Sequence, residues 1–286
     1  MTDNRHEKQT LITGGTGKTG RRIAQRLRER GVPIRIGTPS SDLPFDWEDQ
    51  STWGPALQGV SSVHISYFPD LAVPGAVAYV RSFAEVAIEH GARRLVLLSG
   101  RGEKEAQRGE RAVQETDADV TVVRCAFFMQ NFSENYILEP IQAGEVVLPA
   151  RDQLDPFVDA DDIAAVVVAA LTDDRHIGEL YELTGPRLLT FPGAVGEIAA
   201  AIGRDIRYVP VSVEEYEAVM IEENVPEEFR WLLSHVFGEV LGGSAYLTDG
   251  VQRALGRPPR DFSDFVRDTA ATGAWDVSAA VTSPAP

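Results

Sequence analysis

Residues 11–31, LITGGTGKTGRRIAQRLRERG, contain the pattern that indicates the fold class most clearly. A short apolar run leads into three spaced glycines, and the residues after them have the spacing of an amphipathic helix. In this order, Gly14 allows a tight turn, Gly17 lets the backbone approach a pyrophosphate, and Gly20 permits close packing of helix on strand. The alternative is an ordinary glycine-rich turn. The position near the start of an alternating chain favours a dinucleotide-binding turn.

The start of this helix supplies binding groups of its own. Its first amides have no partner within the helix, and its positive dipole end favours a phosphate. Thr16, Lys18 and Thr19 add side-chain donors. The stretch is not a P-loop, because the Lys18–Thr19 pair lacks the preceding GxxxxG spacing. We therefore expect this turn to hold the diphosphate of a nicotinamide dinucleotide.

The residues after the second predicted strand bear on which nicotinamide cofactor is bound. NAD sites usually place an acid there for the ribose diol, and no acid directly follows Ile36. Arg35, Thr38, Ser40 and Ser41 would instead suit a 2′-phosphate. This pattern favours NADP(H) over NAD(H). The alternative for Arg35 is a strand residue that faces solvent.

Asp46 and Trp47 end a predicted short strand and have two interpretations. The carboxylate could accept from the exocyclic amine of adenine while the indole packs beside the base. Equally, the pair could be a helix cap and a packed indole. The sequence leaves both open.

The first 160 residues or so alternate short apolar runs with helical patterns, which predicts a parallel sheet with crossover helices. The predicted strands are 10–15, 32–38, 42–47, 61–67, 93–100 and 119–128, with helices between them. The expected fold class is α/β, a Rossmann-type doubly wound sheet with a smaller, mainly helical C-terminal lobe. Ligands of such sheets bind beyond the carboxyl ends of the strands.

The same patterns suggest domain limits. We expect a dinucleotide-binding domain at 1–155, to which a strand and a helix at 156–190 return. Helical patterns separated by Pro and Gly predict a small substrate-binding lobe at 191–275. The last residues, 276–286, are predicted to form a disordered tail.

Composition limits the partners and the compartment. The chain has 286 residues, a net charge of −16 and a pI near 4.7, which argues against broad nucleic-acid or anionic-membrane binding. One cysteine, Cys125, cannot form an intramolecular disulfide, and the start of the chain has no apolar signal core. We expect a cytoplasmic protein with a small hydrophobic substrate. Whether it is a monomer or a dimer is open.

Seven motifs, in order between residues 10 and 275, carry a resemblance to a known family. They are TGGTGKTGRRIAQRL, PFDWEDQSTW, LVLLSGRGEKEAQRGERAV, TVVRCAFFMQNFSE, FVDADDIAAV, YELTGPRLLTF and GRPPRDFSDFVRDTAATGAW. Together they resemble the NmrA-like branch of the atypical short-chain dehydrogenases/reductases. That branch includes iminium reductases of fungal clavine alkaloids, quinone reductases, and ketoreductases of bacterial aromatic natural products. The resemblance implies an NADP(H)-binding domain and a small substrate-binding lobe.

The resemblance also implies roles for residues at three strand ends. Ser66, Tyr67 and Phe68 would line the path of the nicotinamide ribose, and Ser99 and Gly100 would lie near the reacting carbon. The pocket would be closed by residues that follow the sixth predicted strand, namely Phe127, Phe128, Gln130 and Asn131.

The usual proton donor of the superfamily is missing. Ordinary members use a tyrosine and a lysine four residues later, and none of the seven tyrosines here has a lysine at that spacing. Ser99 is the first alternative, and its hydroxyl would position a substrate oxygen more than protonate it. The competing interpretation is a strand-end serine that satisfies local backbone.

Other residues with reactive side chains have simpler interpretations. His64 lies inside a predicted strand and is expected to be buried and satisfied. Cys125 is expected to be a packed thiol. The acids at 159, 161 and 162 fit a helix N-terminus better than a metal site, and no metal is expected.

The sequence thus favours an NADPH-dependent reductase that delivers hydride to a carbonyl of a hydrophobic polycyclic aromatic natural-product intermediate. A phenol beside a ketone would supply the proton that the missing tyrosine cannot. An iminium or quinone reductase of the same family is one alternative. A non-catalytic NADP(H)-sensing regulator is another, because it too would lack the tyrosine and lysine.

Overall fold

The computed structural model describes residues 8–243 and 245–277. These residues form two compact units. The first unit holds residues 8–126, 160–184 and 248–259. The second unit holds 127–159, 185–243, 245–247 and 260–277.

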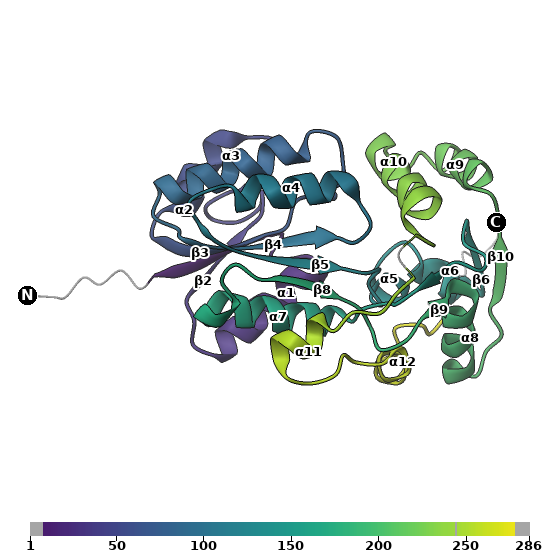
Figure 1. Cartoon of the computed structure of the whole chain (residues 1–286). Helices are drawn as coiled ribbons and strands as arrows, with labels where there is room; N and C mark the ends of the chain where they lie inside the picture. Colours follow the sequence, from purple (N-terminus) through teal and green to yellow (C-terminus); the bar gives the residue numbers. More distant parts are fainter. Residues whose placement is uncertain (1–7, 244, 278–286) are drawn as a thin grey trace, which may run out of the picture. The chain divides into compact units, whose positions relative to one another are not determined.

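A six-stranded parallel sheet forms the centre of the first unit, in the order β2-β1-β3-β4-β5-β8 (Figure 1). Its strands are β1 (Gln9–Thr13), β2 (Ile34–Gly37), β3 (Val60–Ile65), β4 (Arg94–Gly100), β5 (Asp119–Cys125) and β8 (Leu180–Leu183). The chain leaves β1 for β2 on one side and returns to β3 on the other. This reversal makes the gap between the carboxyl ends of β1 and β3 the switch point at which such sheets bind ligands.

Helices cover both faces of this sheet (Figure 1). One layer holds α2 (Trp53–Leu57), α3 (Ala76–Glu89) and α4 (Lys104–Gln114), and the other holds α1 (Lys18–Glu29), α7 (Ala160–Thr172) and α11 (Gly250–Leu255). Short 3-10 turns lie at Gln50–Thr52 and Asp174–His176. The predicted α/β fold class is therefore confirmed.

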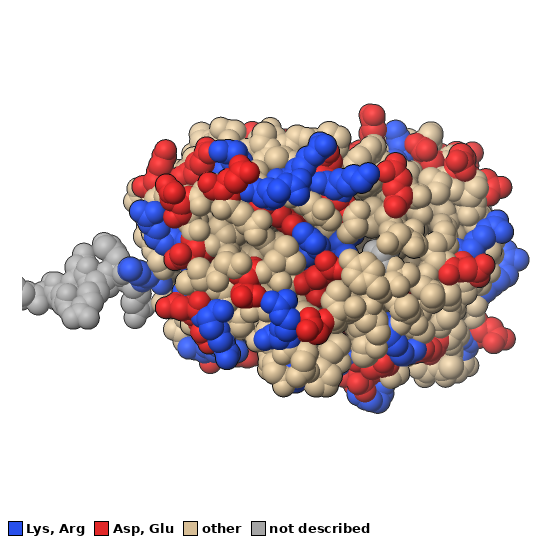
Figure 2. All heavy atoms as spheres, in the orientation of Figure 1, with Lys and Arg blue, Asp and Glu red and all other residues tan. Residues whose placement is uncertain are grey.

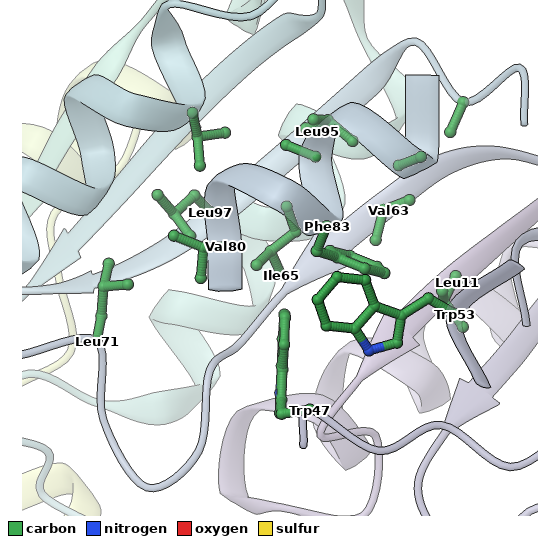
Figure 3. Packing of buried hydrophobic residues seen from close by; sticks show 14 of the residues in the cluster. Leu11, Trp47, Trp53, Val63, Ile65, Leu71, Val80, Phe83, Leu95 and Leu97 are labelled. Carbon is green, nitrogen blue, oxygen red and sulfur yellow. The ribbon is translucent and has the colours of Figure 1, made fainter. Parts of the chain in front are cut away.

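The predicted strand at 42–47 is wrong, because this segment is an irregular loop. Its aromatic side chains turn inward and pack edge-on against Phe83 of α3, with ring centroids 5.2 Å away for Phe45 and 5.1 Å away for Trp47. Figure 3 shows Trp47 and Trp53 beside Phe83, within the apolar core between α3 and the sheet. Phe45 and Trp47 thus alternate with polar residues because both are buried from a loop, and this pattern resembles that of a strand.

The second unit combines helices with two small sheets. Its helices are α5 (Asn131–Glu134), α6 (Leu138–Ala143), α8 (Phe191–Ile202), α9 (Val213–Glu222), α10 (Glu227–His235), which continues as a π-helical turn at Val236–Val240, and α12 (Phe262–Ala270). Strand β6 (Glu145–Leu148) pairs in parallel with β10 (Arg207–Pro210), and β7 (Leu154–Asp155) pairs antiparallel with β9 (Leu189–Thr190). Edge-on contacts of Phe157 with Phe132 and Phe191, at 5.4 and 5.1 Å, lie in its core.

The two units divide the chain differently from the predicted domains. Residues 127–155 and 185–190 belong to the second unit, and the helix at Gly250–Leu255 belongs to the first. Of the predicted tail at 276–286, positions 278–286 lie outside the described residues. Among residues 8–243 and 245–277, no helix is both long and apolar enough to cross a membrane.

Candidate functional site

The loop between β1 and α1 presents mainly backbone groups, because three of its four residues are glycines. Strand β1 ends at Thr13, and α1 begins at Lys18 with Gly17 as its N-cap. No side chain caps this helix end, and its first turn contains no acid. Its amides and dipole are therefore available to an anion from outside the helix.

Close contacts explain the glycines of this loop. Gly14 has a φ of 62°, in the left-handed region that favours glycine. A Cβ on Gly20 would lie 2.1 Å from the carbonyl oxygen of Gly14, and one on Gly15 would lie 2.8 Å from Ile36. A Cβ on Gly17 would meet only the Gly14 oxygen, at 3.2 Å. Side chains would fill this cradle, so the loop fits a ligand that binds to backbone, such as a dinucleotide diphosphate.

The predicted side-chain donors of the loop differ in exposure. Thr16 is exposed and Lys18 is half-buried, so both can reach a ligand at the loop. Thr19 is 6% exposed, and its side chain is buried at the start of the helix. A role for Thr19 would therefore depend on its backbone amide.

The end of β3 lies directly beside the glycine loop. A Cβ on Gly14 would be 3.5 Å from Oγ of Ser66. The hydroxyl of Thr13 accepts from the Ser66 amide at 2.8 Å, and Nε1 of Trp47 donates to the Ser66 carbonyl at 3.2 Å. Thr13 is therefore a positioning residue that sequence reasoning missed. A hydroxyl in the last residue before the paired glycines is the signal that could have found it.

Tyr67 and Phe68 follow Ser66 in the loop after β3. Tyr67 is half-buried against Trp47, with ring centroids 5.0 Å apart. Phe68 is 66% exposed. The structure thus brings Ser66 to the loop and leaves Phe68 on the surface.

Arg35 is not at the cofactor end of β2, which corrects the predicted contact with a 2′-phosphate. Its Nη1 donates to the carbonyl oxygens of Ala56 and Gln58, at 2.6 and 2.8 Å. Arg35 is the second residue of a strand that ends at Gly37, so its guanidinium reaches the end of α2 instead. An arginine would suit a 2′-phosphate, but this one lies too early in the strand to reach the end where the cofactor is expected.

Hydroxyls do gather at the carboxyl end of β2. Oγ1 of Thr38 lies 3.4 Å from Oγ of Ser40, and Oγ of Ser41 lies 2.7 Å from the Thr38 carbonyl. Thr38 is buried and Ser40 is exposed. This hydroxyl turn follows β2, on the same sheet edge as the glycine loop.

Trp47 adopts the packing alternative rather than an adenine contact. It is 8% exposed, and its ring lies among Phe45, Phe83 and Tyr67. Oδ1 of the half-buried Asp46 accepts from the amide of Glu48 at 3.0 Å. Both residues therefore stabilise the loop at 42–49.

Ser99 is bound within the protein, which corrects its predicted role toward the substrate. Its hydroxyl donates to Oε1 of Glu110 at 2.6 Å, and the residue is 5% exposed. A serine has one proton to donate, so this bond leaves none for a substrate oxygen. Ser99 instead belongs to a buried network at the ends of β4, β5 and β8.

Two arginines and two glutamates complete this network. Arg124 donates to Glu110 through Nε at 2.9 Å and to Glu182 through Nη1 at 3.2 Å. Arg101 donates to the other oxygen of Glu182 at 2.8 Å. These hydrogen bonds, first those to Glu110, raise the pKa of Arg124. The network ties three neighbouring strands to α4.

His64 and Cys125 are packed residues. His64 is fully buried in β3, and this burial lowers its pKa to about 4. Its two ring nitrogens have no hydrogen-bond partner among the described residues, so the prediction of a satisfied imidazole is wrong. Burial likewise raises the pKa of the Cys125 thiol, so it is not a reactive thiolate at neutral pH.

The three acids around the start of α7 have arginine partners. Asp161 pairs with Arg26 at 2.7 Å, Asp162 with Arg257 at 2.6 Å, and Asp159 with Arg260 at 3.1 Å. No cluster of three or more His, Cys, Asp or Glu side chains in the described part of the chain is arranged to hold a metal.

The residues predicted to close the pocket lie in the second unit. Phe127 packs edge-on against Phe191 at 5.2 Å, and Phe128 forms a bridge with Val158. Gln130 is 3% exposed and donates to Asp159 at 2.8 Å, so it holds a buried acid, which corrects its predicted substrate contact. Asn131 is half-buried and begins α5.

Comparison with known proteins decides the family. The NmrA-like family model matches residues 108–254, slightly more than half of the chain. An uncharacterized oxidoreductase, YesF of Bacillus subtilis, is 32% identical over 279 residues, which cover 93% of this chain and 97% of that protein. The chain belongs to the NmrA-like family. The predicted resemblance is therefore confirmed.

Further curated members that resemble this NmrA-like protein have named activities. Agroclavine dehydrogenase of Claviceps fusiformis is 29% identical, over 90% of this chain and 96% of that one. NAD(P)H azoreductase of Xenophilus azovorans is also 29% identical, over 91% and 98%.

Solved structures share the fold at lower identity. The NADPH-dependent quinone oxidoreductase QOR2 of Escherichia coli, complexed with NADPH, has a TM-score of 0.75 at 20% identity, over 91% of this chain and 99% of that one. Triphenylmethane reductase of Citrobacter sp., complexed with NADP(H), has a TM-score of 0.69 at 18% identity, over 91% and 99%. Nmra, a negative transcriptional regulator in complex with NAD, has a TM-score of 0.70 at 16% identity, over 93% and 98%.

Proposed function

We propose that this protein is an NADPH-dependent reductase that delivers hydride to a carbonyl of a hydrophobic, polycyclic aromatic natural-product intermediate. The observation that carries the proposal is the glycine cradle beside Ser66 at the switch point of the sheet. The enzyme class and the nicotinamide cofactor class agree with the names of two curated relatives, an agroclavine dehydrogenase and an NAD(P)H azoreductase.

The chain's own residues would divide the binding of NADPH between two strand ends. Backbone at Gly14 and Gly17 and the start of α1 would hold the diphosphate, with Thr16 and Lys18 as side-chain donors. Thr38 and Ser40 would hold the 2′-phosphate in the place where NAD sites carry an acid. When bound, the reduced nicotinamide supplies a hydride, and the protein orients it and excludes water.

Flat conjugated electrophiles suit a site without the tyrosine and lysine of the superfamily. Relatives and fold neighbours are named as an azoreductase, an agroclavine dehydrogenase, a quinone oxidoreductase and a triphenylmethane reductase. A conjugated quinone or azo group spreads the negative charge that hydride adds, and a cationic iminium or triarylmethane is neutralised by it. A quinone or iminium is therefore the alternative substrate class to an aromatic ketone.

The direct test is turnover of a panel. Purified protein is incubated with NADPH and with aromatic ketones, quinones, azo dyes and a cyclic iminium, and the loss of nicotinamide absorbance is followed. We expect steady oxidation of NADPH with at least one planar electrophile and none with simple aliphatic alcohols or ketones. Tight NADPH binding without turnover on any member would contradict the reductase.

That negative outcome would support a second candidate, an NADP(H)-sensing regulator. The observation in its favour is that Ser99, the predicted substrate-positioning residue, is bound within the protein. A fold neighbour is also a transcriptional regulator that binds NAD. A protein partner whose binding depends on NADPH would distinguish this function.

A further inference from the structure

The carboxyl group of Glu103 occupies an unusual place at the end of β4. An ideal Cβ built on Gly100 would lie 1.8 Å from Oε2 and 2.6 Å from Cδ of Glu103. The carboxyl therefore fills the space where any residue other than glycine would carry its side chain. A larger residue at position 100 would displace the Glu103 carboxyl from this place.

One oxygen of this carboxyl is buried without a hydrogen-bond partner among the described residues. Glu103 is 5% exposed, and its Oε2 has no hydrogen-bond partner among residues 8–243 and 245–277. Buried carboxylates are otherwise paired or hydrogen-bonded, because removing a charge from water is costly. An unsatisfied buried acid in a native fold therefore calls for a functional explanation.

The charge that acts on Glu103 is a second carboxylate, Asp70, in the loop after β3. Leu71 of that loop packs on α4, where a Cβ on Gly109 would lie 2.9 Å from its Cδ1. Asp70 itself accepts from the amide of Ala72 at 2.8 Å. Two acids thus lie on adjacent elements at one edge of the sheet.

Lys104, the next residue, is exposed, and the two arginines of the network after β4 and in β5 bind other carboxylates. Arg101 donates to Glu182, and Arg124 to both Glu110 and Glu182. Burial first, and then the charge of Asp70, raise the pKa of Glu103 to about 9. A carboxyl in this state keeps its proton at neutral pH and is an acid near its working range.

We propose that Glu103 is the proton donor of the reduction, in place of the missing tyrosine. This inference rests on the proposed reductase function. Glu103 follows β4, the glycine loop follows β1 and Ser66 follows β3, so all three lie at the carboxyl ends of adjacent parallel strands. Substrates of doubly wound sheets bind at this edge.

The step is a simple proton transfer. Addition of hydride from NADPH to a carbonyl, quinone or azo group leaves an electron pair on its oxygen or nitrogen. The O–H bond of Glu103 breaks, the proton goes to that atom, and the bonding pair remains on the carboxylate. Beside Asp70 this carboxylate is unfavourable, so it takes a proton from water before the next turnover.

The experiment compares Glu103→Gln with wild type on two classes of electrophile. A quinone or azo dye needs a proton, whereas a cyclic iminium or a triarylmethyl cation is neutral after hydride addition alone. We expect the variant to lose about a hundredfold or more in kcat on the first class and to change little on the second. Glu105→Gln, on the same helix and more exposed, is the matched control and should behave as wild type.

A second readout needs no turnover. Carboxyl-carbon NMR of the wild type, with the Glu103→Gln spectrum as the assignment, should show Glu103 titrating near pH 9. Titration at the ordinary value of a glutamate, or equal losses on both substrate classes, would overturn the proton donor. If the wild type reduces neither class, both the reductase and the donor role are refuted. If the wild type reduces quinones and Glu103→Gln reduces them equally well, only the donor role is refuted.

Discussion

Arg35 closes the last turn of α2. The carbonyl oxygens that it binds, those of Ala56 and Gln58, belong to the end of a short helix whose last carbonyls have no partner within the helix. Burial lowers the pKa of Arg35, but an arginine stays charged at neutral pH. Its charge therefore stabilises the first unit and is not directed at a cofactor phosphate.

We predict different effects for Arg35→Ala and Ser40→Ala. Arg35→Ala should lower the free energy of unfolding by about 1–2 kcal/mol and weaken NADPH and NADH by the same factor. Ser40→Ala should leave stability unchanged and weaken NADPH more than NADH. Urea unfolding and calorimetric titration measure both. If Arg35→Ala weakened NADPH binding but not NADH binding, Arg35 would contact the 2′-phosphate after all.

For single residues, the sequence predicts backbone conformation better than it predicts side-chain contacts. Glycine spacing marks a turn because only glycine tolerates the contacts at Gly14 and Gly20. The sequence does not say which way Ser99 points or that Glu110 lies beneath it, since that pairing joins a strand to a helix eleven residues away. Glu103 went unnoticed because nothing local shows that Gly100 leaves room for it.

Strand β3 contains the element-level feature that responds to pH. His64 lies between Ile12 of β1 and Val96 of β4 and is fully buried. In the unfolded chain its pKa is near 6.5, and burial lowers the folded value to about 4. The folded state thus binds fewer protons in this window, so its stability is fully present above pH 6.5 and falls as the pH drops toward 4.

We predict that His64→Leu removes part of this acid sensitivity. Between pH 7 and pH 4 the wild type should lose about 3 kcal/mol more stability than the variant. His90→Gln, at an exposed helix end, should keep the wild-type slope. Urea unfolding at several pH values measures the difference, and parallel curves for wild type and His64→Leu would refute it.

Elements with strong periodicity were predicted well, and those set by tertiary packing were not. Helices α1, α3 and α8 follow apolar spacing and end in glycine-rich turns, and the strands of the sheet follow continuous apolar runs. Residues 42–47 looked like a strand because their aromatic side chains are buried.

The negative net charge of the whole molecule has to be compatible with binding of an anionic cofactor. The chain carries a net charge of −16, and Figure 2 shows acidic and basic side chains interspersed over the face in view. An anionic dinucleotide is compatible with this surface because the glycine loop offers amides and a helix dipole rather than a cluster of cations. The family was predictable because seven motifs kept their order, whereas the unit boundaries were not, since each unit is assembled from separate stretches of chain.

We propose that backbone at the start of α1 holds the diphosphate of NADPH. Gly17→Ala tests it, because the new Cβ would meet only the Gly14 oxygen, at 3.2 Å, and would add a side chain to the loop that we propose binds the diphosphate. Gly196→Ala, in α8 with open space around it, is the control. Calorimetric titration should show NADPH binding to wild type and Gly196→Ala alike, and at least about tenfold weaker binding to Gly17→Ala, a difference of about 1.4 kcal/mol. Unchanged affinity in Gly17→Ala, or no binding of NADPH or NADH to the wild type, would contradict the account.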